Sequence, residues 1–226
     1  NIWDDWPAPQ YNENFYESCD LIMNISKQTV AIVKEVAKKK PRTDWDCTYI
    51  PHGIHEDEYK PITDEKEITE MNAMRKQLTD DNIEFVVFYN NRNIRRKLPG
   101  DIIMAYKHFC DQLPKEQADK CCLLMHTQPR DQNGTDLPVV AKTIAPDYKV
   151  YFSENKLSVQ QLNYLYNIAD VTINMASNEG FGLGTCESLM AGTPIIVNVT
   201  GGLQDQCGFK LNDKFVTYED YDEIKS

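Results

Sequence analysis

The sequence lacks an excess of positive charge. Against 24 lysines and arginines it has 35 aspartates and glutamates, which gives a formal net charge of -11 at pH 7. Nucleic acids and anionic membrane surfaces are bound mainly through basic side chains. The composition therefore argues against a nucleic-acid partner and gives no support to peripheral membrane association. Any anionic ligand must be held by a few well-placed cations and by backbone N–H groups.

Long hydrophobic runs and metal-binding cysteine spacings are also missing. No apolar run approaches the roughly 20 residues that cross a bilayer, and no charged-then-apolar signal segment stands at the start. The seven cysteines are an odd number, Cys121 and Cys122 are adjacent, and no CxxC pair occurs. Neither a disulfide framework nor a zinc site is indicated. We expect reduced, mostly buried thiols in a cytoplasmic protein.

What the sequence does contain is an alternation of apolar strands and amphipathic helices. Hydrophobic residues make up 41% of the chain, enough to bury a core. The alternation predicts an α/β fold with a parallel sheet. Predicted strands cover residues 20–26, 47–50, 84–89, 121–125, 148–152, 171–174 and 194–197. Predicted helices cover residues 27–39, 101–112, 137–144, 158–169 and 183–191. We interpret the charged stretch 56–67 as a linker.

Two unusual loops follow strands of this predicted sheet. One covers residues 90–100 and is rich in Arg and Lys, and the other covers residues 176–184 and is rich in Gly and Glu. Both come at the carboxyl ends of their strands, the edge at which open α/β sheets bind ligands. The placement predicts a binding site at this edge.

Two glutamates frame the more distinctive loop. Seven residues separate Glu179 from Glu187, and Gly180, Gly182 and Gly184 are among them. Carboxylates accept hydrogen bonds from sugar hydroxyls, glycines let a backbone approach a ligand, and a helix start can cradle a diphosphate. The alternative is a glycine-rich turn before an ordinary helix with two solvated glutamates. The flanking glycines and the downstream Ala-Gly-Thr-Pro sequence favour the ligand site.

The basic loop supplies two candidate cations. Arg92 and Lys97 closely follow the predicted strand 84–89 and can point back over the same edge. An arginine and a lysine there would neutralise a phosphate leaving group as its bond breaks. Most basic runs are only solvated surface, and on its own this loop leaves both interpretations open.

Together these residues resemble a known family. The pattern is similar to that of the retaining GT-B fold glycosyltransferases of family 4. The E-x7-E motif of that family matches Glu179 to Glu187, and its arginine and lysine, five positions apart, match Arg92 and Lys97.

Further matches cover most of residues 20–207. Residues 51–54 resemble the turn before the interdomain linker, although His52 stands where asparagine is commoner. Residues 196–202 resemble the strand and Gly-Gly loop that follow the motif. Residues 91–93 together with residues 180–183 look closest to the corresponding segments of viral and marine environmental members.

The resemblance implies a role for each matching residue. Glu179 would contact hydroxyls of the transferred sugar, and Glu187 would accept hydrogen bonds from the ribose of the donor. Arg92 and Lys97 would stabilise the departing diphosphate, so that neither a metal nor a cofactor is needed. The donor would be a UDP- or GDP-sugar and the acceptor a glycan, a lipid or a protein. The loop backbone would position sugar and phosphate, through Gly180, Phe181, Gly182, Leu183 and Gly184.

The implied fold is a Rossmann-like parallel sheet with helices on both faces, the C-terminal half of a GT-B fold. Residues 1–55 would be the tail of the acceptor-side domain, residues 56–80 a linker and first helix, and residues 81–226 a truncated donor-binding domain. Such a chain is expected to bind a donor yet to be a poor catalyst. A non-catalytic nucleotide-sugar-binding module is the second hypothesis. A dinucleotide-dependent oxidoreductase is the third, but the glycine spacing does not give GxGxxG.

Overall fold

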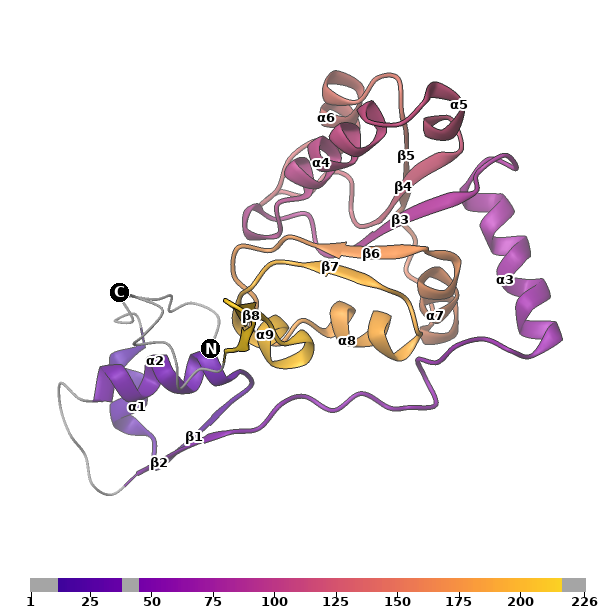
Figure 1. Ribbon diagram of the computed structural model, residues 1–226. Helices are drawn as coiled ribbons and strands as arrows, with labels where there is room; N and C mark the ends of the chain where they lie inside the picture. Colours follow the sequence, from indigo (N-terminus) through magenta and orange to yellow (C-terminus); the bar gives the residue numbers. More distant parts are fainter. Residues whose placement is uncertain (1–11, 38–44, 217–226) are drawn as a thin grey trace. The chain divides into compact units, whose positions relative to one another are not determined.

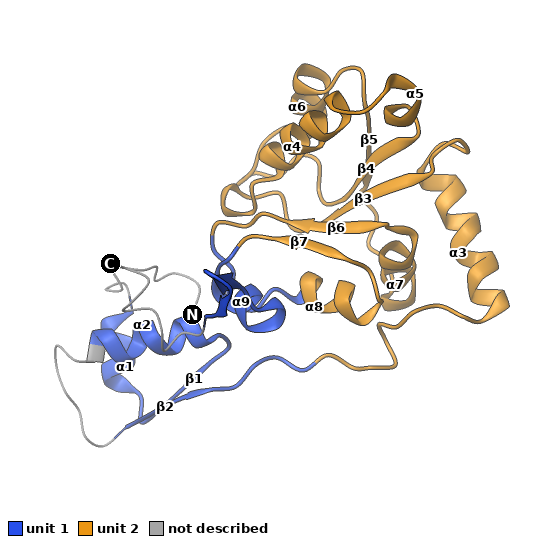
Figure 2. Cartoon of the chain, viewed as in Figure 1, with its two compact units in different colours: residues 1–53, 178–183, 199–226 blue, residues 54–177, 184–198 orange. Residues whose placement is uncertain are grey.

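The computed structural model describes residues 12–37 and 45–216. Two compact units are present (Figure 2), and the chain passes between them more than once. Unit 1 is formed within residues 1–53, 178–183 and 199–226, and unit 2 by residues 54–177 and 184–198.

Unit 2 is built on a parallel sheet of five strands in the order β5-β4-β3-β6-β7 (Figure 1). The first strand, β3, lies in the middle, and later strands add first on one side and then on the other. This is the doubly wound arrangement, in which the strand order reverses between β3 and β6. The expected α/β fold with a parallel sheet is confirmed. The strands are β3 (Phe85–Asn90), β4 (Cys121–His126), β5 (Lys149–Ser153), β6 (Val171–Asn174) and β7 (Ile195–Val197).

Helices cover both faces of this sheet, and each face has its own core. Successive side chains of a strand point to opposite faces. Val87 and Tyr89 therefore join a core with α4 and α6, whereas Val86 and Phe88 join a second core with α7. A strand buried on both sides must be largely apolar, as β3 is from Phe85 to Tyr89. The helices are α3 (Glu65–Leu78), η1 (Arg95–Lys97), α4 (Pro99–Asp111), α5 (Lys115–Ala118), α6 (Leu137–Ile144), α7 (Val159–Ile168) and α8 (Leu183–Met190).

Side-chain caps fix the starts of three of these helices. Asp136 accepts a hydrogen bond from the backbone N–H of Val139 at the start of α6. Ser158 and Gln161 form a capping box at α7. Asp64 accepts hydrogen bonds from two backbone N–H groups at the start of α3. Because of this cap, α3 begins inside the stretch 56–67, so the linker predicted there is three residues too long. None of the helices in the described ranges is long and apolar enough to cross a membrane.

Unit 1 has a small parallel pair of strands, β1 and β2, with a helix between them. Val33 and Val36 of that helix pack against Tyr16. The Asp205 carboxylate accepts a hydrogen bond from the backbone N–H of Lys27 at 2.8 Å, which joins α9 to the start of α2. The elements are α1 (Glu13–Ser18), β1 (Leu21–Asn24), α2 (Lys27–Ala37), β2 (Asp46–Tyr49), α9 (Gly201–Cys207), β8 (Lys210–Leu211) and β9 (Lys214–Phe215).

One prediction for unit 1 is wrong and one falls partly outside the described residues. The segment expected to be a Gly-Gly loop forms the first turn of α9 instead. Glycine is a poor helix former, but Gly201 and Gly202 are held by contacts within unit 1 that leave no room for a side chain. The helix predicted over 27–39 begins at Lys27 as expected, and its last two residues lie outside the described ranges.

Candidate functional site

The candidate site lies where the strand order of unit 2 reverses. The pairing of β3 with β6 ends at Phe88 and Thr172, two residues before either strand ends. The last residues of the two strands, Asn90 and Asn174, therefore lie beyond the paired region. Ligands of doubly wound sheets bind outside the carboxyl ends of the strands at this reversal. The candidate site is therefore formed by the last residues of β3 and β6 and by the loops that follow them.

A buried asparagine joins the loop after β3 to the loop after β4. The side-chain amide of Asn93 donates to the backbone oxygens of Gln128, Pro129 and Thr135, at 3.2, 3.1 and 2.7 Å. Its oxygen accepts from the Thr135 N–H at 3.3 Å. A Cβ at Gly134 would overlap Asn93, so only glycine fits there. The loop that carries Arg92 and Lys97 is thus fixed by its neighbour.

Arg92 is held by a two-point ion pair within unit 2. Its Nε lies 2.8 Å from Oδ2 of Asp131 and its Nη2 lies 3.2 Å from Oδ1. The Arg92 side chain is 61% exposed, whereas that of Asp131 is 6% exposed. The guanidinium lowers the pKa of Asp131, and the carboxylate raises the pKa of Arg92. Two of the five N–H donors face Asp131, which leaves the others for an anionic ligand.

Lys97 ends the short helix η1 and is buried, with 7% of its surface exposed. The backbone around it is tied to β3 and to the loop that follows β6. The Tyr89 hydroxyl donates to the Lys97 carbonyl at 3.4 Å, and the Ser177 N–H donates to the Arg96 carbonyl at 2.8 Å. The next residue, Leu98, has a φ of 51°. The chain therefore turns sharply after Lys97 and leads directly into α4.

The Glu187 side chain receives hydrogen bonds from two tyrosines of unit 2. Its Oε2 accepts from the Tyr166 hydroxyl at 2.6 Å, and the Tyr59 hydroxyl also interacts with the carboxylate and lowers its pKa. The Tyr166 oxygen in turn accepts from the Asn90 side-chain amide at 2.7 Å. Glu187 is half-buried. Three elements and the segment before α3 thus meet around one carboxylate at the end of β3.

Burial and these contacts shift the ionisation of all three acidic groups. Burial raises the pKa of Glu187, and the hydrogen bonds from Tyr166 and Tyr59 oppose that rise. Burial, and to a smaller extent the nearby Glu187 charge, raises the pKa of Tyr59 to about 12. The same two causes raise the pKa of Tyr166 well above its ordinary value. At neutral pH both phenols are protonated donors, so Glu187 is their acceptor.

Buried hydroxyls fix helix α8 to β6, and the start of α8 closely approaches Tyr166 of α7. Ser188 donates to the Thr172 hydroxyl at 2.8 Å, and the Asn174 amide donates to the Thr185 hydroxyl at 3.2 Å. A Cβ at Gly184 would lie 3.2 Å from the Tyr166 oxygen. The absence of a side chain at Gly184 therefore lets α8 bring Glu187 up to Tyr166.

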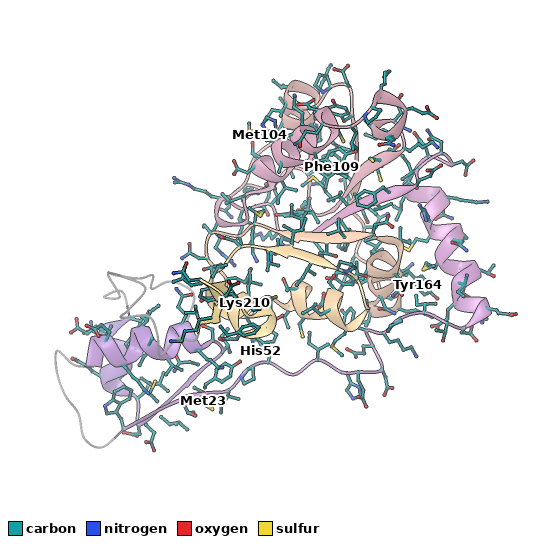
Figure 3. The ribbon with its side chains drawn as sticks, viewed as in Figure 1. Met23, His52, Met104, Phe109, Tyr164 and Lys210 are labelled. Atoms are coloured by element: carbon teal, nitrogen blue, oxygen red, sulfur yellow. The ribbon has the colours of Figure 1, made fainter. Side chains whose placement is uncertain are left out.

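The other glutamate lies in unit 1, on the segment 178–183. This segment packs against the start of α9, where the Gly202 N–H donates to the Gly180 carbonyl at 3.0 Å. The Gln206 amide donates to the Phe181 carbonyl at 2.6 Å. The rings of Phe181 and His52 pack in a T-shaped arrangement, with centroids 5.3 Å apart, and His52 is labelled in Figure 3. The backbone beside Glu179 is thus held by α9 and by the turn after β2.

The residues predicted for the site are divided between the two units. Unit 2 brings together Gly184 and Glu187 on α8 and holds Arg92 and Lys97 on the loop after β3. Unit 1 holds Glu179, Gly180, Phe181, Gly182 and Leu183. Gly182 has a φ of 91°, a conformation that favours glycine.

Sequence reasoning missed several residues that shape the site. Tyr166 lies in the predicted helix 158–169 but has no role in the predicted site, and its hydroxyl donates to Glu187. Asp131 and Tyr59 carry no motif, because their partners are far away in the sequence. Of the residues that shape the site, Asn93 alone could have been noticed in the sequence, because it is a polar residue in a basic loop directly after a buried strand.

His126 and the cysteines are titratable groups that the predicted site does not include. His126 ends β4, and its Nδ1 lies 3.1 Å from the Ser153 hydroxyl, so it is a satisfied part of the sheet edge. Burial lowers its pKa. All seven cysteines are free thiols. Within residues 12–37 and 45–216, no group of three or more His, Cys, Asp or Glu side chains could hold a metal ion.

Comparison with known proteins decides the family. The sequence profile described as "Glycosyl transferases group 1" matches residues 70–222, more than half of the chain. The chain belongs to this family. A curated member of similar sequence is the alpha-monoglucosyldiacylglycerol synthase of Acholeplasma laidlawii, 27% identical over 195 residues. The match covers 84% of this chain and 44% of that protein. The group 1 chain thus spans less than half the length of this relative.

Solved structures show the same fold. A sucrose-phosphate synthase from Thermosynechococcus elongatus matches with a TM-score of 0.63 and 21% identity, over 86% of this chain and 44% of the other. The Anabaena protein HepE, solved in complex with UDP-glucose, matches with a TM-score of 0.67 and 15% identity, over 95% and 57%. At such identities these likenesses concern the fold. This chain is therefore a group 1 glycosyltransferase domain with the GT-B type of α/β architecture.

Proposed function

We propose that the chain is the donor-binding part of a retaining glycosyltransferase of family 4. It would transfer a sugar from a UDP- or GDP-sugar to a glycan, lipid or protein acceptor in the cytoplasm, without a metal or a cofactor. The family membership supports glycosyl transfer. The complex of HepE with UDP-glucose supports a nucleotide-sugar donor for a protein of the same fold.

The observation that carries this proposal is the Glu187 carboxylate at the reversal point of the sheet. A carboxylate offers about four acceptor positions. The two tyrosines occupy part of this capacity, which leaves room for the two neighbouring hydroxyls of a ribose. Glu187 is thereby assigned to the nucleoside of the donor.

The remaining residues take the roles that the E-x7-E pattern implies. Glu179 contacts hydroxyls of the transferred sugar, and the backbone from Gly180 to Gly184 positions sugar and phosphate. Arg92 and Lys97 stabilise the diphosphate as it leaves. In a front-face substitution the acceptor oxygen bonds to the anomeric carbon on the face from which the diphosphate departs, so the sugar keeps its anomeric configuration. The leaving phosphate accepts the proton of the acceptor hydroxyl.

Titration calorimetry of the 226-residue chain with UDP, GDP, ADP and NAD, without added metal, tests the proposal. We expect roughly micromolar binding of UDP or GDP and at least a tenfold loss in Glu187→Gln, which keeps the size of the side chain but removes its charge. Glu70→Gln is the matched control, because Glu70 also accepts from a tyrosine of α7, at 2.8 Å from Tyr164.

Unchanged UDP and GDP affinity in Glu187→Gln would contradict the site assignment. Tight binding of NAD without binding of UDP or GDP would instead support the dinucleotide hypothesis. Donor binding without transfer of the sugar to any acceptor, also in a longer form of the chain, would support a binding module.

A further inference from the structure

The hydrogen bonds around Tyr166 have a defined direction. The Asn90 amide donates to the Tyr166 oxygen at 2.7 Å, and an amide N–H cannot accept in return. The single phenol proton is therefore left for the other short contact, at 2.6 Å to Oε2 of Glu187. The order of donors runs from Asn90 through Tyr166 to Glu187.

The Tyr166 ring is fixed from two sides, so the position of its hydroxyl is fixed as well. The ring meets Phe88 edge-on, with centroids 5.3 Å apart, and Tyr59 at 6.0 Å. Tyr166 has no exposed surface. A phenylalanine would fill the same core space. A buried hydroxyl is costly unless it is hydrogen-bonded, so this one needs its partners, Asn90 and Glu187.

We propose that Tyr166 is a positioning residue for nucleotide binding, assisted by Tyr59: the two hydroxyls orient the Glu187 carboxylate and keep it an acceptor for the ligand. This inference rests on the proposed function, since it assigns the ligand of Glu187 to the nucleoside. It goes beyond the E-x7-E pattern because both tyrosines lie outside that motif.

The arrangement makes nucleotide binding depend on pH. The groups that face Glu187 are Tyr166 on α7, Tyr59 in the segment before α3, with Glu58 beside it, and Cys186 on α8 itself. Burial favours the protonated carboxyl and the phenols favour the ionised one. Affinity should fall as the pH drops through the Glu187 pKa. Without the Tyr166 hydroxyl that pKa rises further, so affinity is lost at a higher pH.

The test compares Tyr166→Phe with a matched control on the same helix. Tyr164→Phe removes a hydroxyl that donates to Glu70 at 2.8 Å, and Tyr164 is labelled in Figure 3. Affinity for whichever of UDP and GDP binds the wild-type chain is measured by calorimetry from about pH 5 to pH 8. We expect about tenfold weaker binding in Tyr166→Phe at neutral pH, as for the loss of a hydrogen bond to a charged group. The midpoint of the pH profile should also move upward. Tyr164→Phe should match the wild type.

A second variant, Tyr59→Phe, distinguishes a loss of the carboxylate's partner from a folding defect caused by Tyr166→Phe. Tyr59→Phe should shift the pH midpoint in the same direction as Tyr166→Phe. If both variants keep the wild-type affinity and midpoint while Glu187→Gln loses binding, the inference is overturned and the proposed function stands. If the wild-type chain binds neither UDP nor GDP, or Glu187→Gln binds like the wild type, the proposed function fails and the inference fails with it.

Discussion

At the scale of single residues, two arginine–aspartate pairs of unit 2 have the same distance but differ in how far the aspartate is exposed to solvent. Arg92 with Asp131 and Arg130 with Asp136 each have an Nε–Oδ2 distance of 2.8 Å. The Asp131 side chain is 6% exposed, but that of Asp136 is 41% exposed. A buried carboxylate moves little and so gives Arg92 a defined direction.

Replacing Asp131 should therefore weaken donor binding without unfolding the protein. In Asp131→Asn the guanidinium loses its ionic partner and must be ordered by the ligand, which costs affinity. We expect several-fold weaker UDP or GDP binding by calorimetry. The change in Tm should be small, because the Arg92 side of the pair is 61% exposed and solvent screens its charge. Asp136→Asn is the control, since asparagine also caps a helix. Equal affinities in the two variants would argue against a role for Arg92.

At the scale of elements, periodicity predicted most of the sheet unit. The strand over 171–174 and the helix over 137–144 have the expected bounds, because their local pattern agrees with their burial. The start of α9 was missed, since two glycines argue locally for a loop and only contacts with segment 178–183 make the helix. The partners of Glu187 were missed for the same kind of reason: Tyr59 and Tyr166 reach it through tertiary packing.

The glycines of α9 give a prediction at this scale. In Gly202→Ala the added Cβ would lie 2.5 Å from the Phe181 carbonyl oxygen, so the segment that carries Glu179 must shift. We expect faster hydrogen exchange in residues 178–183 and lower affinity for UDP-glucose or GDP-mannose, by about tenfold or more. Gly53→Ala, with nothing within 4 Å of its Cβ, is the control. Wild-type exchange in Gly202→Ala would show that the segment is not held there.

At the scale of the whole molecule, the sequence predicts the α/β fold class and a glycosyltransferase of the GT-B type, whereas the free-energy cost of burying the Glu187 charge depends on the tertiary structure. The Glu187 carboxylate is half-buried, and burial raises its pKa, while the two tyrosines and no cation oppose that rise. A raised pKa in the folded state means that the folded chain binds a proton more tightly than the unfolded chain. This contribution makes stability fall as the pH rises from the ordinary value, near 4.5, through the raised value.

Glu187→Gln should thus stabilise the chain at neutral pH while it impairs binding. Each unit by which the folded-state pKa is raised corresponds to about 1.4 kcal/mol. Thermal denaturation of the variant and the wild type should show a higher Tm for the variant at pH 7. The difference should shrink below the ordinary carboxyl pKa, where both chains are neutral at this position. A lower Tm for the variant at pH 7 would contradict a net cost of the buried charge.

The hydrogen bonds of Asn93 have a consequence for how this protein can diverge. They tie residues 91–98 to residues 128–135 through backbone atoms, so an insertion or deletion in one loop would misalign the other. Among related proteins that keep these hydrogen bonds, the lengths of the two loops should therefore either both change or both stay the same. A chimera that takes one loop from a relative with a different loop length should regain binding only when the second loop comes from the same parent.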